Sequence, residues 1–456
     1  MKSRMPALRW PVLLFPVFGC LFYIFVQLQM ETKILAKRIA DIRIRTRSYL
    51  KQNEAIAAKL MKENRRNANL SRYLSERAGY PVYDRTNFKY YPLGDDFFPD
   101  LLEELKAAER FIFLEYFIIQ RGEMWDSVLK ILEEKAAAGV DVRVLYDGMN
   151  SFSNLPHDYP KELEARGVRC RIFNPIRPAI STSQNNRDHR KILVIDGHTA
   201  FTGGVNLADE YINRKVRFGH WKDNAVRLKG EAVKSFTVMF LQMWSVCAFR
   251  PEYDFDYGPF LDTGDHFHSP ALNMDGYSIP FSDSPLDGEP VGHQVYLDIL
   301  YQARRYVYIM TPYLILDDDM VTALTYAAKR GVDTVIVMPH IPDKKYAFML
   351  AHSYYPELME AGVKIYEYLP GFIHSKTFVS DDEKAVVGSI NMDFRSQYLN
   401  FECAVYIYKN PVIGDIRADF DETLKKCVRM SMESYESLPL MHRFWGRTLR
   451  LIAPLM

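Results

Sequence analysis

The sequence is poor in cysteine and has no excess of charge of either sign. Its five cysteines, in a chain of 456 residues, are scattered, and no two form a Cys-x-x-Cys pair. This pattern argues against a disulfide framework or a structural zinc site, and it favours a reducing compartment. With 58 basic and 57 acidic residues the formal net charge is +1, whereas general nucleic-acid binders usually carry a strong basic excess. We therefore expect no nucleic-acid partner.

Long uncharged runs are also missing, except at the N-terminus. Residues 10–30, WPVLLFPVFGCLFYIFVQLQM, carry no charged side chain. A helix of this length covers about 30 Å, the thickness of the hydrocarbon core of a bilayer. A cleaved signal peptide is the alternative, but the run is long for one and no small-x-small cleavage site follows it. We therefore expect a membrane anchor helix within residues 1–30.

A basic segment follows this apolar run. Residues 31–75 have apolar positions at helical spacing and predict a helical neck. Such a neck is either solvated or lies on anionic lipid, where each basic side chain contributes about 1 kcal/mol. More lysines and arginines follow the apolar run than precede it. By the positive-inside rule, this bias places the bulk of the chain in the cytoplasm.

Residues 437–456 predict an amphipathic C-terminal segment. One helical face carries basic side chains and the opposite face carries apolar ones. These are Arg443, Arg447 and Arg450 on the first face, and Trp445, Leu449 and Ile452 on the second. The pattern favours contact with anionic lipid. A helix packed on the rest of the protein is the alternative interpretation.

The sequence between these terminal segments alternates between strand-like and helix-like stretches, and the alternation occurs twice. RFIFLEYFII at 110–119 and VDVRVLYDG at 140–148 read as strands buried on both faces. YVYIMTPYLI at 306–315 and VDTVIVMPH at 332–340 repeat them in the second half. The sequence therefore predicts a duplicated α/β unit, with one copy in each half of the chain.

Each copy contains the motif H-x-K-x4-D, and the two motifs are 185 positions apart. The residues are His189, Lys191 and Asp196 in the first copy and His374, Lys376 and Asp381 in the second. The same offset relates Asn206 in GGVN to Asn391 in GSIN. A single histidine at a strand end is more often structural. Its repetition at equivalent positions favours a functional site.

The spacing has a geometric consequence. Residues two apart in a strand point to the same face, so each histidine shares a face with its lysine. If the two copies pack about a pseudo-twofold axis, both pairs face one cleft. Cations and amide donors gathered there suit a phosphodiester, whose charge builds on its non-bridging oxygens. One histidine can attack phosphorus while the other protonates the leaving alkoxide, so the prediction includes no metal and no other cofactor.

The two motifs and the G-[GS]-x-N segments after them resemble the phospholipase D superfamily. Within it the chain is most similar to the bacterial cardiolipin synthases. The similarity lies in EYFII, YDGM, GGVNLADEY, MDFRSQYLNFE and the final RLIAPLM. It implies two fused phospholipase D-like lobes, at 76–260 and 261–436, each a mixed sheet flanked by helices. It also implies a location in the bacterial cytoplasmic membrane. Family members usually carry two N-terminal membrane helices, and RWPVLLFPVFG resembles the second.

The resemblance implies that two phosphatidylglycerol molecules give cardiolipin and glycerol through a phosphohistidine. It assigns His189 as nucleophile and His374 as general acid, then base. The two motif lysines, Asn206 and Asn391 would hold phosphate oxygens. Arg395 is equally compatible with a phosphate ligand and with a surface ion pair. The anionic phospholipid and the membrane are the implied partners.

Carboxylates complete the predicted site. Aligning HWKDNAV with NFECAV places Asp223 opposite Glu402, and we expect these two to orient the histidines, since a nucleophilic imidazole needs a partner on its far nitrogen. Asp196 and Asp381 belong to the motif. Each lies seven residues beyond its histidine, about 23 Å along a straight strand, so geometry predicts a role in the turn there.

Several alternatives share these features. A hydrolase of the phospholipase D type differs only in whether water or a lipid hydroxyl reaches the phosphohistidine. A transferase that uses serine or ethanolamine is also compatible with the motifs. The near-zero net charge and the anchor disfavour a nuclease. A non-catalytic lipid-binding scaffold would not need both histidines.

Overall fold

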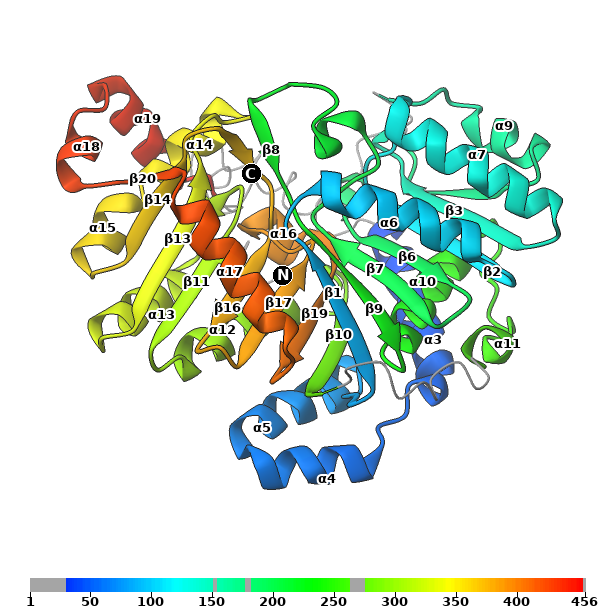
Figure 1. The fold of residues 1–456 in the computed structure, drawn as a ribbon. Coiled ribbons are helices and arrows are strands. Elements are labelled where there is room, and N and C mark those ends of the chain that lie inside the picture. The colour runs from blue at the N-terminus through cyan, green and yellow to red at the C-terminus, as the bar shows by residue number, and fades with distance from the viewer. Residues whose placement is uncertain (1–29, 151–153, 177–181, 263–274, 454–456) are drawn as a thin grey trace.

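The structure is a computed structural model that describes residues 30–150, 154–176, 182–262 and 275–453. Two sheets form its centre (Figure 1). The first has the strand order β1 (Thr86–Tyr91), β9 (Ala225–Gly230), β7 (Thr199–Gly203), β6 (Lys191–Ile195), β2 (Phe111–Tyr116), β3 (Asp141–Asp147) and β4 (Arg169–Phe173). The second has the order β10 (Tyr277–Asp283), β19 (Asn400–Tyr408), β17 (Lys384–Gly388), β16 (Thr377–Ser380), β11 (Tyr306–Met310), β13 (Asp333–Pro339), β14 (Lys364–Tyr368) and β20 (Cys427–Arg429).

The second sheet repeats the first, strand by strand, before β20 is added. In each sheet the central strand, β2 or β11, has a parallel neighbour on one side and an antiparallel neighbour on the other. The predicted duplication of one mixed α/β unit is therefore confirmed. Both sheets lie within the predicted halves 76–260 and 261–436, whose exact bounds stay a prediction.

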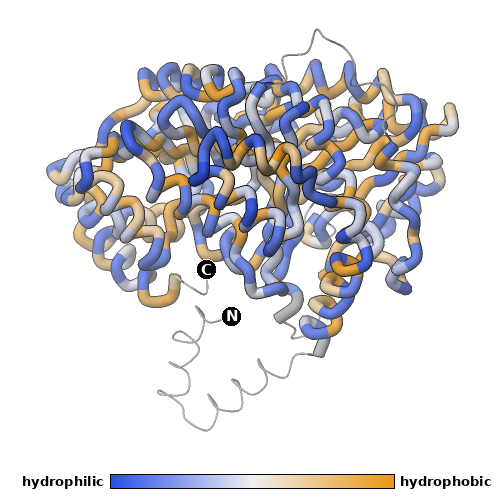
Figure 2. Tube along the Cα trace, turned by 90° about the horizontal axis from the view of Figure 1, so that it is seen from below, coloured by the Kyte–Doolittle hydropathy of each residue, from blue (hydrophilic) through white to orange (hydrophobic). Residues whose placement is uncertain are grey.

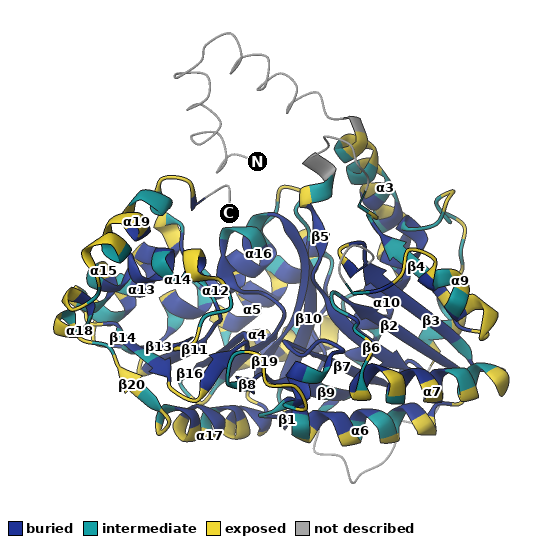
Figure 3. Ribbon diagram, turned by 90° about the horizontal axis from the view of Figure 1, so that it is seen from above, coloured by how far each residue is buried: buried dark blue, intermediate teal, exposed yellow. Residues whose placement is uncertain are grey.

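Helices cover the sheets. In the first half they are α6 (Gly94–Ala107), α7 (Glu123–Ala137), α9 (Tyr159–Ala165), α10 (Val233–Val246) and α11 (Gly258–Leu261). In the second half they are α12 (Val291–Gln302), α13 (Asp318–Lys329), α14 (Lys345–His352), α15 (Tyr355–Glu360), α16 (Phe394–Tyr398), α17 (Val412–Leu424) and α18 (Met432–Glu436). Hydrophobic and hydrophilic positions alternate along the outer helices (Figure 2). In Figure 3 the strands are buried, while helices such as α7 and α17 expose one face. This is the pattern expected when amphipathic helices cover a sheet.

The two halves exchange short strands where they meet. β5 (Arg187–Asp188) comes from the first half but pairs in parallel with β19 of the second sheet. β15 (Gly371–Ile373) of the second half likewise pairs in parallel with β8 (His220–Lys222) of the first. Each exchanged strand ends directly before a motif histidine. The sequence of residues 187–197, RDHRKILVIDG, predicts one continuous strand. This prediction is wrong, because the chain passes from one sheet to the other between β5 and β6.

The segment 31–75 is helical, as predicted, but it is not one free neck. It forms α3 (Met30–Thr46), α4 (Glu54–Glu63) and α5 (Arg65–Tyr73), and Asn53 and Asn64 cap the N-termini of the last two helices. Ile39 and Ile42 of α3 are buried, and Gln242 of α10 donates a hydrogen bond to Thr46 at 2.8 Å. Burying these apolar side chains favours packing on the body over a solvated neck.

The predicted anchor, residues 1–30, lies almost entirely outside the described residues. Within the described part of the chain, no helix combines the length and the apolar character that crossing a bilayer requires. The C-terminal segment forms α19 (Leu440–Arg450), which packs on α14. Close packing there requires Gly446, because a Cβ at this position would lie 2.3 Å from the carbonyl oxygen of Met349.

Candidate active site

The two motif histidines line one cavity. It has a volume of about 660 Å³ and is walled by residues of both halves, including His189, His374, Asn206, Asn391 and Arg395. Lys191 and Lys376 are buried and are absent from its wall. Each donates its Nζ to the carbonyl oxygen of its own histidine, two residues earlier. The two histidines therefore converge on one cavity. The prediction that each lysine faces the same cleft as its histidine is wrong, because both lysines lie behind the histidines and bond to their carbonyl oxygens.

Each histidine is hydrogen-bonded to a carboxylate of the opposite half. His189 Nδ1 lies 2.9 Å from both carboxylate oxygens of Glu402, and His374 Nδ1 lies 2.6 Å from Asp223 Oδ2. An ionised carboxylate can only accept, so each Nδ1 carries the proton and Nε2 is the free ring nitrogen. The two carboxylates are the predicted ones, and their pairing is crossed between the halves.

The exchanged strands cause this crossing. The backbone N–H of His189 donates to Phe401 O at 2.9 Å, which places its ring beside the next residue, Glu402. In the same way, the N–H of His374 donates to Lys222 O at 2.7 Å and brings its ring beside Asp223. The site is thus assembled by the contact between the lobes, and neither half alone supplies both members of either cavity histidine–carboxylate pair.

Both carboxylates are fully buried and stay ionised. Burial acts to raise the pKa of the Glu402 carboxyl, but His189, Lys191 and the Ser389 hydroxyl lower it by more. Burial likewise acts to raise the pKa of Asp223, and His374 and Lys376 bring it below its usual value. Glu402 also accepts from Ser396 Oγ at 2.6 Å. Fixed, ionised partners of this kind hold an imidazole in one tautomer and one orientation.

The histidines and lysines are all less basic than usual. Burial, together with the nearby lysines, lowers the pKa of His189 to about 4 and that of His374 to about 3, although Glu402 and Asp223 act to raise them. Burial also lowers the pKa of Lys191 to about 8 and that of Lys376 to about 7. In the free protein both imidazoles are therefore neutral near pH 7. An anionic phosphate bound beside them would raise all four pKa values.

Asp196 and Asp381 lie away from the cavity. The Asp196 carboxylate accepts from the backbone N–H groups of Glu109, Arg110 and Phe111 at 2.7–2.8 Å. Asp381 makes the equivalent bonds to residues 304–306. Both have positive φ, 53° and 59°, a conformation that Asp tolerates in turns. The motif groups these two aspartates with the catalytic residues, and that grouping is wrong. As their distance along the strand predicts, they fix the turns that follow β6 and β16.

Of the predicted phosphate ligands, Asn206, Asn391 and Arg395 line the cavity, and they differ in how many hydrogen bonds they already make. Asn206 is already bonded, because it accepts from the Ile118 N–H at 3.0 Å and donates to the Tyr211 hydroxyl at 2.8 Å. Asn391 donates its backbone N–H to Ser396 Oγ at 2.8 Å. Among the described residues, Arg395 makes a single long hydrogen bond, 3.5 Å from Nη1 to Asn185 O. Arg395 is thus placed as a cavity residue, and Asn206 also supports the wall.

Aromatic side chains that were not predicted from the sequence surround the two histidines. Phe117 packs edge-on against His189, with ring centroids 4.9 Å apart. Tyr211 packs edge-on against His374 at 5.4 Å, and Trp221 lies 5.6 Å from the same ring. These rings exclude water from the imidazoles. The signal was partly present, because Tyr211 belongs to the family-like segment GGVNLADEY.

Comparison with known proteins identifies the family to which the chain belongs. Residues 101–244 and 296–424 match the family described as "Cardiolipin synthase, PLD-like domain". The chain belongs to this family. The cardiolipin synthase of Alkalihalophilus pseudofirmus is 34% identical over all of this chain and 90% of its own length, and that of Geobacillus kaustophilus is equally similar. An "Uncharacterized protein" of Streptococcus mutans is 50% identical over 98% of this chain and 95% of its own length.

A solved structure shows the same fold. The phosphatidylserine synthase of Haemophilus influenzae covers 87% of this chain with all of its own, at a TM-score of 0.64 and 14% sequence identity. The predicted membership in the cardiolipin synthase branch, and with it a phosphatidyltransferase, is confirmed at the level of the family. Within the described ranges, no three His, Cys, Asp or Glu side chains are placed to hold a metal ion. The metal-free reaction stays a prediction.

Proposed function

We propose that the protein makes cardiolipin from two molecules of phosphatidylglycerol. The observation that carries this is the pair of carboxylate-bound histidines, one from each lobe, at one cavity beside two buried lysines. His189 Nε2 attacks phosphorus and the bond from phosphorus to the glycerol oxygen breaks. The bound phosphate raises the pKa of His374, which is then protonated on Nε2 as well. His374 gives this Nε2 proton to the glycerol oxygen, so free glycerol leaves and phosphatidyl-His189 remains.

The second half of the reaction reverses these roles. A hydroxyl of the second phosphatidylglycerol gives its proton to His374 Nε2 while its oxygen attacks phosphorus, and the bond to His189 breaks. Cardiolipin leaves, and both histidines return to their starting states. Lys191 and Lys376 stabilise the charge on the phosphate oxygens throughout. The choice of His189 as nucleophile rests on the likeness of the first copy to the nucleophile copy of related enzymes.

Product analysis tests the reaction. Membranes that carry the full chain, supplied with phosphatidylglycerol as the sole lipid substrate, should form cardiolipin and glycerol in equal amounts. Phosphatidic acid as the main product would replace this proposal by the hydrolase. A phosphatidyl ester of added serine or ethanolamine, formed in preference to cardiolipin, would indicate a different acceptor.

The pKa values of the lysines predict an alkaline limb. Lys376 and Lys191, with pKa values of about 7 and about 8, lose their charge as the pH rises. We therefore expect kcat/KM to fall above about pH 7–8 and not to fall between about pH 7 and about pH 5, because His189 stays neutral there. Lys376→Arg should shift this fall in kcat/KM to higher pH, since arginine keeps its charge. Lys384→Arg, at a buried lysine outside the cavity wall, is the control. An acid limb near the usual histidine pKa would contradict this expectation.

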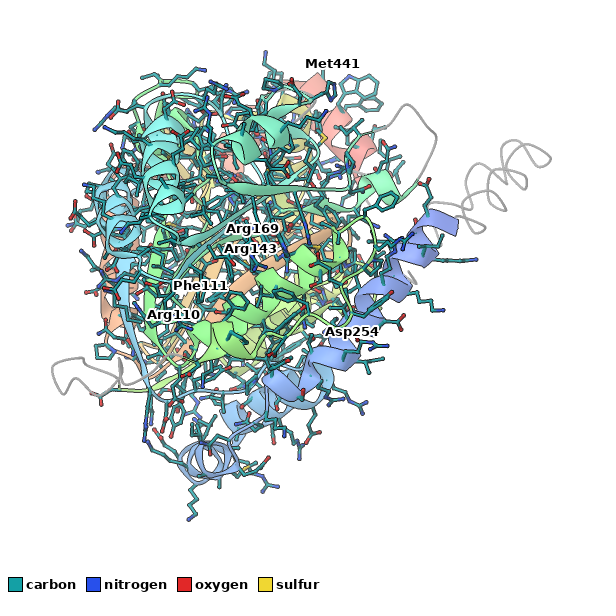
Figure 4. All side chains as sticks on the ribbon, turned by 90° about the vertical axis from the view of Figure 1, so that its right-hand side faces the viewer. Arg110, Phe111, Arg143, Arg169, Asp254 and Met441 are labelled. Carbon is teal, nitrogen blue, oxygen red and sulfur yellow. The ribbon has the colours of Figure 1, made fainter. Side chains whose placement is uncertain are left out.

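We propose that the membrane lies against the side that carries α19 and the N-terminal end of α3. Figures 3 and 4 show both on one side, with α16, which carries Arg395, between them in Figure 3. Met441, labelled at the edge of Figure 4, and Phe444 are 61% and 58% exposed. Exposed apolar side chains beside arginines suit anionic lipid. An anchor within residues 1–30 would enter on the same side.

A negative charge introduced at an apolar position of α19 tests this orientation. Phe444→Glu should lower turnover of phosphatidylglycerol in vesicles by about fivefold or more, because insertion of one large apolar side chain is lost. Turnover of a monomeric short-chain phosphatidylglycerol should be unchanged. Phe249→Glu, at an exposed phenylalanine after α10, is the matched control. An equal loss on both substrates would mean that α19 acts only through packing.

A further inference from the structure

The cavity departs from its own twofold symmetry at one position. The offset of 185 that relates the histidines, lysines and asparagines also relates Glu210 to Arg395. Both side chains line the cavity, so one side presents a carboxylate where the other presents a guanidinium. A site that bound only a symmetric phosphodiester would have no use for an acid near its anion. The carboxylate therefore points to a ligand group that donates hydrogen bonds.

Only one of the two carboxylate oxygens of Glu210 accepts a hydrogen bond from a described residue. Glu210 is only 2% exposed, and its Oε1 accepts from Arg217 Nη1 at 3.0 Å. Oε2 is buried and accepts no hydrogen bond from any described residue. Leaving a buried carboxylate oxygen unpaired costs free energy that a hydroxyl donor would recover. Arg217 also lines the cavity, and its side chain is 55% exposed.

The position of this pair ties it to one histidine. Glu210 lies in the 3-10 turn η5 (Asp209–Ile212), and the next residue, Tyr211, packs against His374. Trp221 contacts both rings, 4.8 Å from Tyr211 and 5.6 Å from His374. The pair therefore belongs to the His374 side of the cavity. In the proposed reaction His374 first protonates the leaving glycerol and then deprotonates the incoming one, so both glycerols occupy this side.

We propose that Glu210 and Arg217 form the glycerol subsite. Glu210 Oε2 accepts a hydrogen bond from a glycerol hydroxyl that is not reacting. The guanidinium of Arg217 pairs with the phosphate that only the incoming phosphatidylglycerol carries beyond its glycerol. The subsite thus holds a neutral glycerol in the first half of the reaction and a glycerol phosphodiester in the second. This assignment rests on the proposed function and explains why a lipid hydroxyl competes with water.

Two acceptors, glycerol and phosphatidylglycerol, distinguish the role of Arg217 from that of Glu210. Full-length protein in phosphatidylglycerol vesicles with labelled glycerol gives three products: cardiolipin, labelled phosphatidylglycerol by exchange, and phosphatidic acid from water. Arg217→Gln should lower cardiolipin about tenfold relative to glycerol exchange, because only cardiolipin formation uses the acceptor phosphate. Glu210→Gln should lower both about tenfold relative to phosphatidic acid.

The surface pair Glu123 and Arg214 provides matched controls. Arg214 Nε lies 3.2 Å from Glu123 Oε1, and each side chain is 52% exposed. Glu123→Gln and Arg214→Gln should leave all product ratios unchanged. Product ratios unchanged in Arg217→Gln and Glu210→Gln would overturn the subsite and leave only a structural ion pair. Absence of cardiolipin from the unsubstituted protein would instead overturn the proposed function. Because Arg217 is exposed, its variant tests the subsite even if Glu210→Gln does not fold.

Discussion

Replacing His189 by alanine should lower cardiolipin formation by about 10⁴-fold or more, because no other described cavity residue replaces the nucleophile. His374→Ala should cause a comparable loss with phosphatidylglycerol, since a glycerol alkoxide is a poor leaving group without a proton. The measurement is the rate of cardiolipin formation in vesicles, together with detection of phosphatidyl-enzyme after an alkaline denaturing quench, which preserves the acid-labile phosphorus–nitrogen bond. Labelled phosphate on His189, and not on His374, is the expected result.

An activated substrate separates the two roles. Phosphatidyl-p-nitrophenol releases a phenolate that needs no general acid. His374→Ala should therefore still release nitrophenolate and form phosphatidyl-His189, whereas His189→Ala should do neither. The opposite result, with release preserved in His189→Ala and lost in His374→Ala, would reverse the assignment of nucleophile and acid.

Removing either buried carboxylate should lower turnover by about 10³-fold, and the two losses should differ in kind. Glu402→Gln removes the acceptor that fixes the Nδ1–H tautomer of His189, so phosphatidyl-enzyme should form slowly with every substrate. Asp223→Asn affects His374, so nitrophenolate release should be largely retained. The crossed pairing predicts that a residue of the second half controls the histidine of the first.

A buried glutamate elsewhere serves as control. Glu367 accepts from His352 Nε2 at 3.0 Å and from His340 Nδ1 at 2.9 Å, and it is absent from the cavity wall. Glu367→Gln should lower the melting temperature without changing the product or the nitrophenolate assay. If Glu402→Gln were rescued by the activated ester and Asp223→Asn were not, pairing within each half would replace the crossed arrangement.

Much of the site could be predicted because its chemistry is repeated in the sequence. The constant offset between His189 and His374, and between Asn206 and Asn391, identified the cavity residues without any knowledge of distance. Strand geometry alone predicted that Asp196 and Asp381 lie too far along the strand to reach phosphate, and the structure places both at turns. Local rules sufficed here, since spacing along one strand or turn fixes these positions.

The packing of the N-terminal helices was harder to predict from the sequence. Apolar periodicity correctly predicted helices between residues 31 and 75, but it could not reveal that α3 packs on α10. That packing depends on Ile39 and Ile42 meeting a surface formed some two hundred residues later in the chain. Periodicity reports which face of a helix is apolar, while the partner of that face is a long-range property.

The sequence by itself determined the family and the duplicated lobes, and it predicted which histidines, lysines and carboxylates belong to the site. Only the tertiary structure decided which carboxylate serves which histidine, and where the aromatic side chains and the Glu210–Arg217 pair lie around them. The reason is that β5 and β15 each pair with a strand of the other half. Two nearly equivalent repeats offer both pairings with the same local sequence, and only backbone hydrogen bonds across the lobes select the crossed one.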